Sequence, residues 1–243
     1  MYCGQSFYES ISFLGVIPMH TDHFKQEIDN LVRRLRNSGY MQSDEMERAF
    51  RTVPREEFVS PDIRRHAYRD SPLPIGLGQT ISAPHMCVIM CEALRLKPGL
   101  KVLEVGAGSG YHAALCAEMV APKSTQTPGH VYTIEIVQGL IDFARNNLER
   151  SGYSDHVTLI HADGGRGLPE HAPFDRILVA AAAPYVPEPL VDQLSLGGIM
   201  LIPVGGKGFF QELMKVQKDE EGNVVQKRWG GVAFVPLTGK YGH

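Results

Sequence analysis

The sequence contains few cysteines, no long hydrophobic run and no excess of positive charge. Four of its 243 residues are cysteine, and a chain of this length buries a sizeable core without disulfides or a bound metal. No run of about 18 consecutive apolar residues occurs, so the sequence predicts no transmembrane helix. The formal net charge is −3, which excludes an overall positive field that would attract nucleic acid or an anionic membrane.

Two of the cysteines, Cys87 and Cys91, are four residues apart and would share one face of a helix. A zinc site needs a second pair of ligands at matching spacing, and the sequence shows none. We therefore expect buried, reduced thiols, no metal and a cytoplasmic protein.

Residues 1–20 differ from the rest of the chain. Residues 1–18 are mildly apolar and contain Glu9, no lysine or arginine and no small-residue cleavage site, which argues against a signal peptide. We interpret 1–20 as a poorly ordered N-terminal extension and 21–243 as one domain. Within it, 21–98 would form a helical elaboration with a substrate loop, and 99–243 would form the core.

Helical patterns dominate the first part of this domain. Apolar residues recur every three or four positions over 22–37, which predicts a helix that ends before Gly39. A second helix is expected over 44–52, with Asp44 and Glu47 as its capping pair.

The next stretch changes character. Prolines and glycines break any regular period over 61–80, which predicts a long loop. Ser82-Ala83-Pro84 would then begin a third helix, which ends at Pro98-Gly99.

Strands and helices alternate from Lys101 onward. Short apolar runs predict strands over 101–105, 130–136, 157–161, 174–180 and 198–204, and helical patterns lie between them over 111–120, 137–150 and 187–194. This alternation predicts an α/β fold with a mostly parallel sheet and helices on both faces. Two further strands, 209–217 and 224–228, would form a C-terminal antiparallel hairpin around a polar turn, and 231–237 would add another strand.

A glycine-rich turn, Gly106-Ala107-Gly108-Ser109-Gly110, follows the first of these strands and opens a helix. Glycines let the backbone turn sharply and approach a ligand closely. A dinucleotide fingerprint would place its third glycine one position later, and the acidic Glu104 favours a ligand with an ammonium group and hydroxyls over a bare pyrophosphate. S-adenosylmethionine is such a ligand; a merely tight turn is the alternative.

Acidic residues end the next two strands. Glu135 stands where an acid holds the ribose hydroxyls of a cofactor in Rossmann-type sheets. Asp163, followed by Gly164, lies at the same sheet edge and could accept a hydrogen bond from an adenine amino group. The alternatives are a solvated acid at Glu135 and a plain Asp-Gly turn.

The segment 79–86 places polar side chains where the long loop meets a helix. Ser82 could serve the site or only cap the helix, and His85 could orient a group or only cap and pack. A serine nucleophile needs a positioned base, and no G-x-S-x-G turn is present, so we do not expect a hydrolase.

These segments resemble the protein-L-isoaspartate (D-aspartate) O-methyltransferase family, over residues 22–238. The sequence Thr-Ile-Ser-Ala-Pro-His-Met over 80–86 is the most specific part, since many methyltransferases share the glycine turn. Many relatives carry a longer tail after the position of Thr238, and 1–20 match nothing in the family. The matching segments are 70–76, 78–86, 102–111, 172–175, 181–184, 186–187, 197–198 and 202–205.

The resemblance implies a class I, Rossmann-like methyltransferase that uses S-adenosylmethionine. It implies methyl transfer to the α-carboxylate of L-isoaspartyl and D-aspartyl residues in damaged proteins and peptides, with Ser82 as the active-site serine. We expect a monomer that binds neither nucleic acid nor membrane. With the glycine turn included, the expected cofactor contacts are Thr80, Ile81, Ser82, Glu104, Gly106, Ala107, Gly108, Ser109, Glu135, Asp163, Gly164 and Thr238.

Three rival functions stay open at this point. A methyltransferase that acts on RNA would show a basic surface with interleaved aromatic residues, whereas basic clusters are sparse here, and a small molecule is another possible acceptor. A catalytically silent binding protein would have a broken glycine turn or lack Ser82. A nicotinamide dehydrogenase would carry the other glycine spacing.

Overall fold

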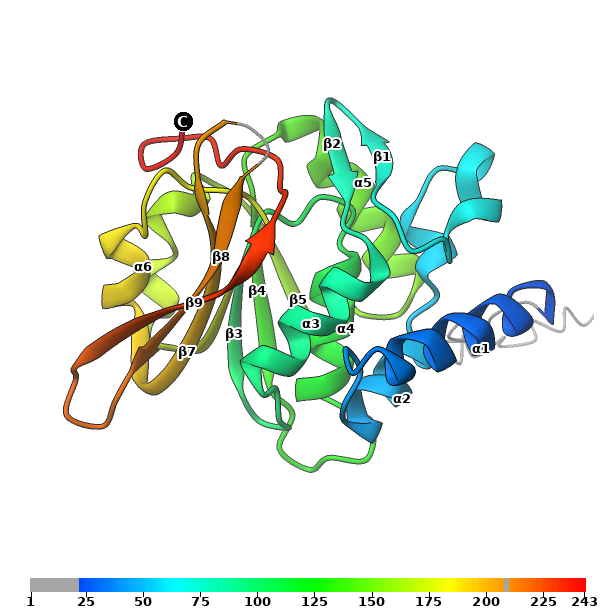
Figure 1. Cartoon of the computed structure of the whole chain (residues 1–243), viewed down its shortest axis with the longest axis horizontal. Coiled ribbons are helices and arrows are strands. Elements are labelled where there is room, and N and C mark those ends of the chain that lie inside the picture. The colour runs from blue at the N-terminus through cyan, green and yellow to red at the C-terminus, as the bar shows by residue number, and fades with distance from the viewer. Residues whose placement is uncertain (1–21, 208–209) are drawn as a thin grey trace, which may run out of the picture.

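A seven-stranded sheet is the central element of residues 22–207 and 210–243, which the computed structural model describes (Figure 1). The expected N-terminal extension lies outside the described residues. The strands follow the order β5-β4-β3-β6-β7-β8-β9, parallel from β5 to β7 and antiparallel at β8 and β9. The predicted parallel sheet and C-terminal hairpin are therefore confirmed. The strands are β3 (Lys101–Val105), β4 (His130–Glu135), β5 (Val157–His161), β6 (Phe174–Val179), β7 (Leu194–Gly205), β8 (Gln211–Lys218) and β9 (Val224–Val232).

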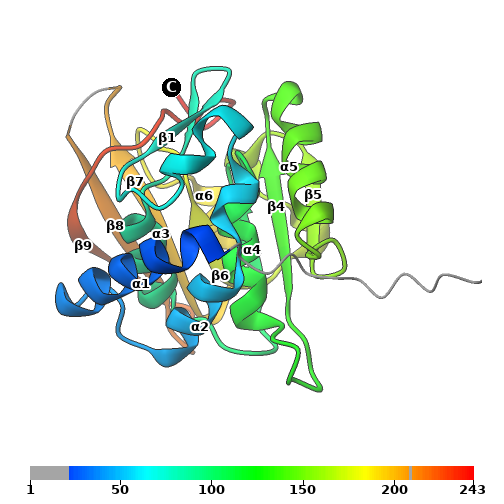
Figure 2. The ribbon, with the colours of Figure 1, turned by 90° about the vertical axis from the view of Figure 1, so that its right-hand side faces the viewer.

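Helices cover both faces of the sheet, as predicted. Figure 1 shows, from left to right, α6 (Glu188–Asp192), the sheet, α3 (Pro84–Leu94) with α4 (Tyr111–Val120), and then α1 (Asp22–Asn37) with α2 (Asp44–Thr52). At the edge of the sheet, α5 (Gln138–Arg150) packs against β4 and β5 (Figure 2). Parallel neighbours require such crossover helices, because a tight turn cannot join two parallel strands.

Each face of the sheet buries its own apolar cluster. Leu31 of α1 and Met90 of α3 belong to the cluster that includes Leu178 of β6. Ile177, the preceding residue of β6, belongs to the opposite cluster with Leu190 of α6. Successive side chains of a strand point to opposite faces, so one strand contributes to both cores.

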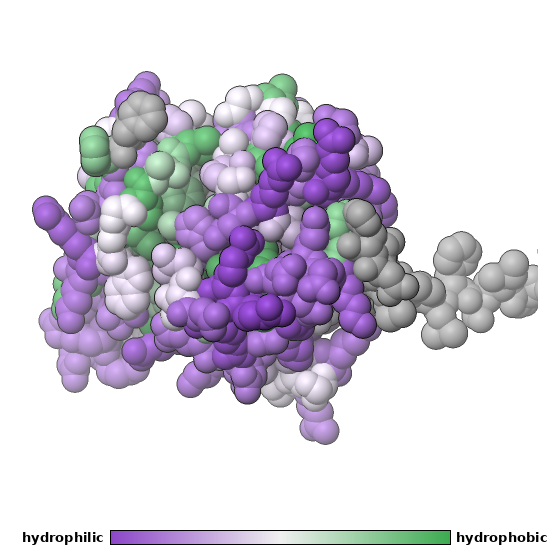
Figure 3. All heavy atoms as spheres, turned by 45° about the vertical axis from the view of Figure 1, so that its right-hand side comes forward, coloured by the Kyte–Doolittle hydropathy of each residue, from purple (hydrophilic) through white to green (hydrophobic). Residues whose placement is uncertain are grey.

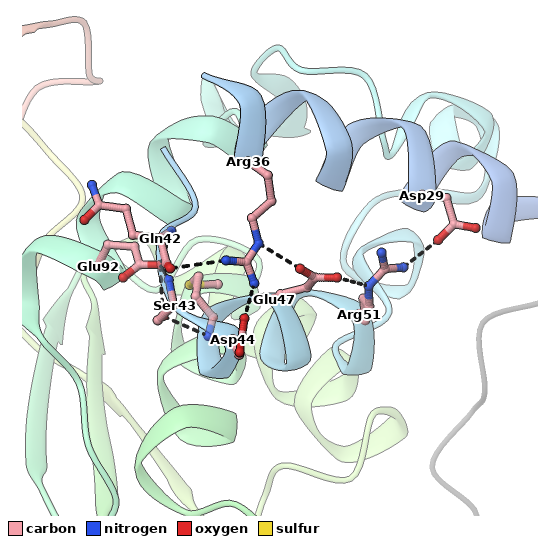
Figure 4. A network of polar contacts seen from close by, with 9 residues as sticks. Asp29, Arg36, Gln42, Ser43, Asp44, Glu47, Arg51 and Glu92 are labelled. Carbon is pink, nitrogen blue, oxygen red and sulfur yellow. Dashed lines mark hydrogen bonds and ion pairs between the residues drawn. The ribbon is translucent and has the colours of Figure 1, made fainter. Parts of the chain in front are cut away.

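Charged side chains join α1 to α2 (Figure 4). Arg36 pairs with Glu47 at 2.8 Å and with Asp44 at 2.6 Å. Arg51 pairs with the other oxygen of Glu47 at 2.9 Å and with Asp29 at 2.6 Å. These hydrogen bonds hold the pKa of the Glu47 carboxyl below its usual value. The face that carries these helices is mainly hydrophilic (Figure 3), and exposed pairs of this kind add little stability one by one.

The N-cap of α2 is Ser43, so the predicted Asp44–Glu47 capping pair is wrong. Ser43 Oγ accepts the Met46 N–H at 3.2 Å and donates to Glu92 Oε1 at 2.9 Å. That carboxylate oxygen of α3 also accepts the backbone N–H of Ser43, at 2.8 Å. Asp44 and Glu47 are drawn instead to Arg36, because a guanidinium of the neighbouring helix is the stronger partner for a carboxylate.

The predicted loop over 61–80 contains regular structure. It begins with a 3₁₀ helix, Pro61–His66, and ends in an antiparallel hairpin of β1 (Leu73–Gly76) and β2 (Gln79–Ile81). Proline is tolerated in such a hairpin because a two-stranded ribbon leaves N–H positions unpaired. Gly76 and Gly78 adopt φ values of +88° and +73°, which allows the tight reversal.

Two other boundaries differ from the sequence prediction. Helix α3 stops at Leu94, before Pro98-Gly99, because Arg95 adopts a left-handed conformation with φ of +52°. The strand expected over 231–237 does not form: β9 ends at Val232, and Pro236 makes an isolated bridge with Ala182. The remaining elements lie where the sequence places them and differ at most at their ends.

The cysteines of the described residues, Cys87, Cys91 and Cys116, are buried and free. Burial raises the pKa of Cys87 to about 12, so its thiol is protonated at neutral pH. Within residues 22–207 and 210–243, no group of three or more metal-ligating side chains could hold an ion. No helix in the same ranges combines the length and the apolar character needed to cross a membrane.

We expect Ser43→Ala to lower the free energy of unfolding by about 1–2 kcal/mol, because the variant loses the cap of α2. Urea denaturation measures the difference. Ser38→Ala is the matched control, since Ser38 is exposed and its hydroxyl makes no hydrogen bond within the described residues. Equal losses in both variants would contradict the capping role.

Candidate active site

The glycine turn after β3 forms one wall of a pocket at the carboxyl edge of the sheet. Gly106, Gly108 and Gly110 have φ values of +95°, +55° and +86°, which L-residues with a side chain rarely adopt. The carbonyl of Ile134 accepts the N–H groups of both Gly106 and Ala107, at 2.9 and 3.0 Å. The turn is thereby fixed to β4, and it leads into the first turn of α4.

The pocket encloses about 790 Å³, part of it open to solvent. Its walls come from the β2–α3 segment, the glycine turn, the ends of β4 and β6, and residues 235–238. Its lining combines glycine backbone, carboxylates and apolar side chains, a mixture that suits a nucleoside cofactor. Most predicted site residues line it together: Thr80, Ile81, Ser82, Glu104, Gly106, Ala107, Gly108, Ser109, Glu135, Gly164 and Thr238.

Glu104 is fully buried in β3, at the bottom of this pocket. Its Oε2 accepts the Thr133 hydroxyl at 2.5 Å, whereas Oε1 has no hydrogen-bond partner within the described ranges 22–207 and 210–243. Burial raises the pKa of Glu104 to about 8; the charge of Glu135 adds to the rise, and the bond from Thr133 opposes it. An unpaired buried carboxyl oxygen in a pocket is a ready acceptor for a cationic ligand group.

Glu135 ends β4 and is 6% exposed. Its Oε2 accepts the Gly108 N–H, and its Oε1 accepts those of Ile136 and Val137, each at 2.9 Å. A carboxylate offers about four lone-pair positions, so Glu135 retains capacity for a ligand hydroxyl. The sequence pattern indicates the ligand role but not this attachment of the glycine turn.

Asp163 lies apart from the pocket lining. Its Oδ1 accepts the Gly165 N–H at 3.1 Å and its Oδ2 accepts the Lys240 N–H at 2.8 Å. Its carboxylate therefore holds the C-terminal segment in place, while Gly164 lines the pocket. A Cβ at Gly164 would stand 2.5 Å from a methyl group of Val105, so only glycine fits between this strand end and β3.

Ser82 lies on the pocket wall just before α3, and it does not cap that helix. The N-cap is Ala83, which has no side chain to accept a hydrogen bond. The Ser82 hydroxyl makes no hydrogen bond within the described residues, although the Ser82 carbonyl accepts one from Arg55. The hydroxyl is thus available to a ligand.

His85 belongs to the packing of the helix start and not to the pocket. Its ring Nδ1 lies 2.8 Å from Asp70 Oδ1, and its backbone N–H donates to the same oxygen at 2.9 Å. Its ring also lies against Tyr40, with centroids 5.9 Å apart. Of the two alternatives for His85, the structure favours capping and packing.

The pocket contains side chains that the sequence reasoning missed, among them His112 in the first turn of α4. Burial lowers the pKa of His112 to about 4, so the imidazole is neutral at neutral pH. Its Nε2 has no hydrogen-bond partner among the described residues. Its place directly after the glycine turn was the available signal.

A doubly wound sheet with an acid-flanked glycine turn at its carboxyl edge defines an enzyme that binds a nucleoside cofactor. The model of the protein-L-isoaspartate(D-aspartate) O-methyltransferase family matches residues 26–242. The chain belongs to this family.

Individual relatives agree with this assignment. Protein-L-isoaspartate O-methyltransferases of Hyperthermus butylicus and Methanopyrus kandleri are each 54% identical to the chain over 90% of its length, and 91% and 94% of their own lengths are covered. A Plasmodium falciparum protein described by the same activity was crystallised with S-adenosyl-L-homocysteine. It superposes with a TM-score of 0.75 at 29% identity, over 86% of this chain and 97% of that one.

Glu104→Gln should stabilise the ligand-free protein increasingly as pH rises. Between about pH 4.5 and 8, the carboxyl of Glu104 is protonated in the folded protein and ionised in the unfolded chain. The free energy of unfolding that this group contributes is therefore full below pH 4.5 and is lost as the pH rises to 8. Glutamine cannot ionise, so within this window the free energy of unfolding of the variant should rise relative to wild type by up to about 1.4 kcal/mol per pH unit.

Urea denaturation of both proteins at pH 5, 6, 7 and 8 measures this gain. Glu170→Gln, on the exposed surface, is the control and should show no trend. A difference between wild type and Glu104→Gln that stays constant with pH would rule out a raised pKa at Glu104.

Proposed function

We propose that this chain transfers a methyl group from S-adenosylmethionine to the α-carboxylate of L-isoaspartyl and D-aspartyl residues in damaged proteins and peptides. The observation that carries the proposal is the shared pocket. One cavity joins the glycine turn, the unpaired oxygen of Glu104 and the free hydroxyl of Ser82. Family membership supplies the reaction, and this geometry supplies the residues for it.

The described residues fit the cofactor. Glu104 Oε1 is a buried acceptor for the α-ammonium group, and Glu135 is the acceptor for ribose hydroxyls. When bound, S-adenosylmethionine supplies an electrophilic methyl group, and its transfer leaves a methyl ester and S-adenosylhomocysteine. A cationic ligand favours the ionised form of Glu104, so the carboxyl gives up its proton as the site fills.

The residues around the acceptor align it and exclude water. An α-carboxylate titrates near pH 3.5, so it is already an anion at neutral pH and needs no general base. Ser82 donates a hydrogen bond to one acceptor oxygen, which leaves the other free to form the new bond. The β1–β2 hairpin and residues 235–238 enclose the approach to the site, so catalysis rests on alignment.

We further propose that the protein acts as a monomer in the cytoplasm and binds neither nucleic acid nor membrane. The buried free thiols of Cys87, Cys91 and Cys116 suit a reducing compartment. The net charge of −3 offers no attraction to nucleic acid.

Isoaspartyl peptides of unrelated sequence should be methylated, and matched aspartyl peptides should be essentially inert. A normal aspartyl residue carries its carboxylate one methylene further out, and a misplacement of about 1 Å can cost 10²-fold in rate. Incorporation of labelled methyl groups into paired peptides measures the difference. Equal labelling of both forms, or labelling of RNA and neither peptide, would contradict the proposed acceptor.

Ser82→Ala should lower kcat about ten- to hundredfold, because a hydrogen bond to a charged acceptor is lost in the transition state. The affinity for S-adenosylhomocysteine and the melting temperature should change little, since Ser82 does not cap α3. Single-turnover rates, calorimetry and thermal melts separate these effects, with Ser38→Ala as control. Normal turnover in the folded variant would show that Ser82 has no catalytic role.

A further inference from the structure

Arg55 lies in the protein interior behind Ser82. Its side chain is 0% exposed. Nε donates to the carbonyl of Ala67 and Nη2 donates to the carbonyl of Ser82, both at 2.7 Å. The guanidinium carbon lies 4.7 Å from the centre of the Tyr111 ring. All these partners are neutral.

The positive charge of Arg55 has no ionic partner in the part of the chain that the structure describes. None of the ion pairs there includes it, and its buried Nη1 lacks a hydrogen-bond partner. Arginine stays charged in proteins, and a buried charge without a counter-charge is costly. Carbonyl dipoles and the aromatic face offset only part of that cost. A negatively charged ligand group bound nearby would compensate the positive charge of Arg55.

The pocket lies next to this charge. Ser82, Tyr111 and Cys87 line the pocket, and Arg55 contacts the first two. The guanidinium of Arg55 bonds the carbonyl of Ser82, a residue that itself lines the pocket. Arg55 is therefore on the side of the cavity where the free hydroxyl of Ser82 awaits an acceptor.

We propose that Arg55 is a positioning residue: it supplies the counter-charge for the acceptor carboxylate and fixes Ser82 through the Ser82 carbonyl. This inference rests on the proposed function. It names the group that makes the site select an anion, whereas Ser82 alone could donate equally well to a neutral carbonyl.

The indirect placement of the charge follows from the reaction. An O–CH₃ bond forms and an S–CH₃ bond breaks, so a carboxylate and a sulfonium become a neutral ester and a neutral thioether. A cation bonded directly to the acceptor oxygen would stabilise the anion before the reaction and make that oxygen a weaker nucleophile. From behind Ser82, Arg55 attracts the anion and leaves one oxygen to the hydroxyl and the other to the methyl group.

The test compares two ligands that differ only in charge: an isoaspartyl peptide and the same peptide with its α-carboxylate replaced by a carboxamide. Calorimetry in the presence of S-adenosylhomocysteine gives both dissociation constants. We expect wild type to prefer the carboxylate by at least about tenfold, since a buried charge acts through a low dielectric. Arg55→Gln should reduce this preference to about threefold or less, mainly by weakening the carboxylate peptide.

Arg176→Gln is the matched control. Arg176 is half-buried, donates to the carbonyl of Leu94 at the opposite end of α3, at 2.6 Å, and donates to the Asp175 carbonyl at 2.6 Å. Like Arg55, it is a guanidinium that donates to a backbone carbonyl beside or within α3, but it lies away from the pocket lining. The control should keep the charge preference of wild type, and both variants should bind S-adenosylhomocysteine as wild type does.

A purely structural role would weaken the carboxylate and carboxamide peptides equally in Arg55→Gln, and that result would overturn the proposal. If this variant fails to fold, wild type and Arg55→Lys decide. Wild type without a carboxylate preference, or Arg55→Lys without one although its charge remains, would also overturn it. Failure of the proposed function is a separate outcome, since wild type would then not methylate the isoaspartyl peptide.

Discussion

The carboxylate of Glu135 holds the ligand-binding edge of the sheet together. Its two oxygens accept N–H groups from the glycine turn at Gly108 and from the start of α5 at Ile136 and Val137. The β3–α4 and β4–α5 connections are therefore held together by one side chain, and both connections line the pocket. Hydrogen bonds to an ionised acceptor are stronger than neutral ones, which suits a junction that must also bind a ligand.

The interior near the pocket holds polar groups in unusual states. Among the described residues, Glu104 is buried with one unpaired oxygen and a pKa raised to about 8 by burial, and His112 is neutral with an unpaired Nε2. Arg55 carries a charge without a carboxylate partner in the described chain. Each group lowers the stability of the ligand-free fold. Their concentration around one cavity indicates that ligand binding, not folding, accounts for them.

Much of the fold could be predicted from the sequence, because its signals are local. The helices 22–37 and 111–120 and the strands 101–105 and 157–161 form as predicted, since their apolar periods contain no breaker. The hairpin over 73–81 escaped prediction because proline and glycine mark loops and hairpins alike.

The site was predictable only in part. The glycine turn and Glu135 have a fixed place relative to a strand end, so the sequence reveals them. Arg55 meets the carbonyl of Ser82, 27 residues away, and only the folded backbone brings the two together. The same holds for Asp163, whose carboxylate binds the backbone at Lys240, 77 residues further along.

In the part of the chain that the structure describes, strand β9 has no neighbour on its outer side and forms one edge of the sheet. Such an edge can template the pairing of another extended chain and so begin aggregation. Here the exposed strand carries Lys227 and Arg228, and its ladder with β8 is interrupted by a bulge at Leu213/Met214. Cationic side chains and a local twist make continued pairing unfavourable. A protein that encounters damaged, partly unfolded polypeptides is thereby protected against adding them to its own sheet.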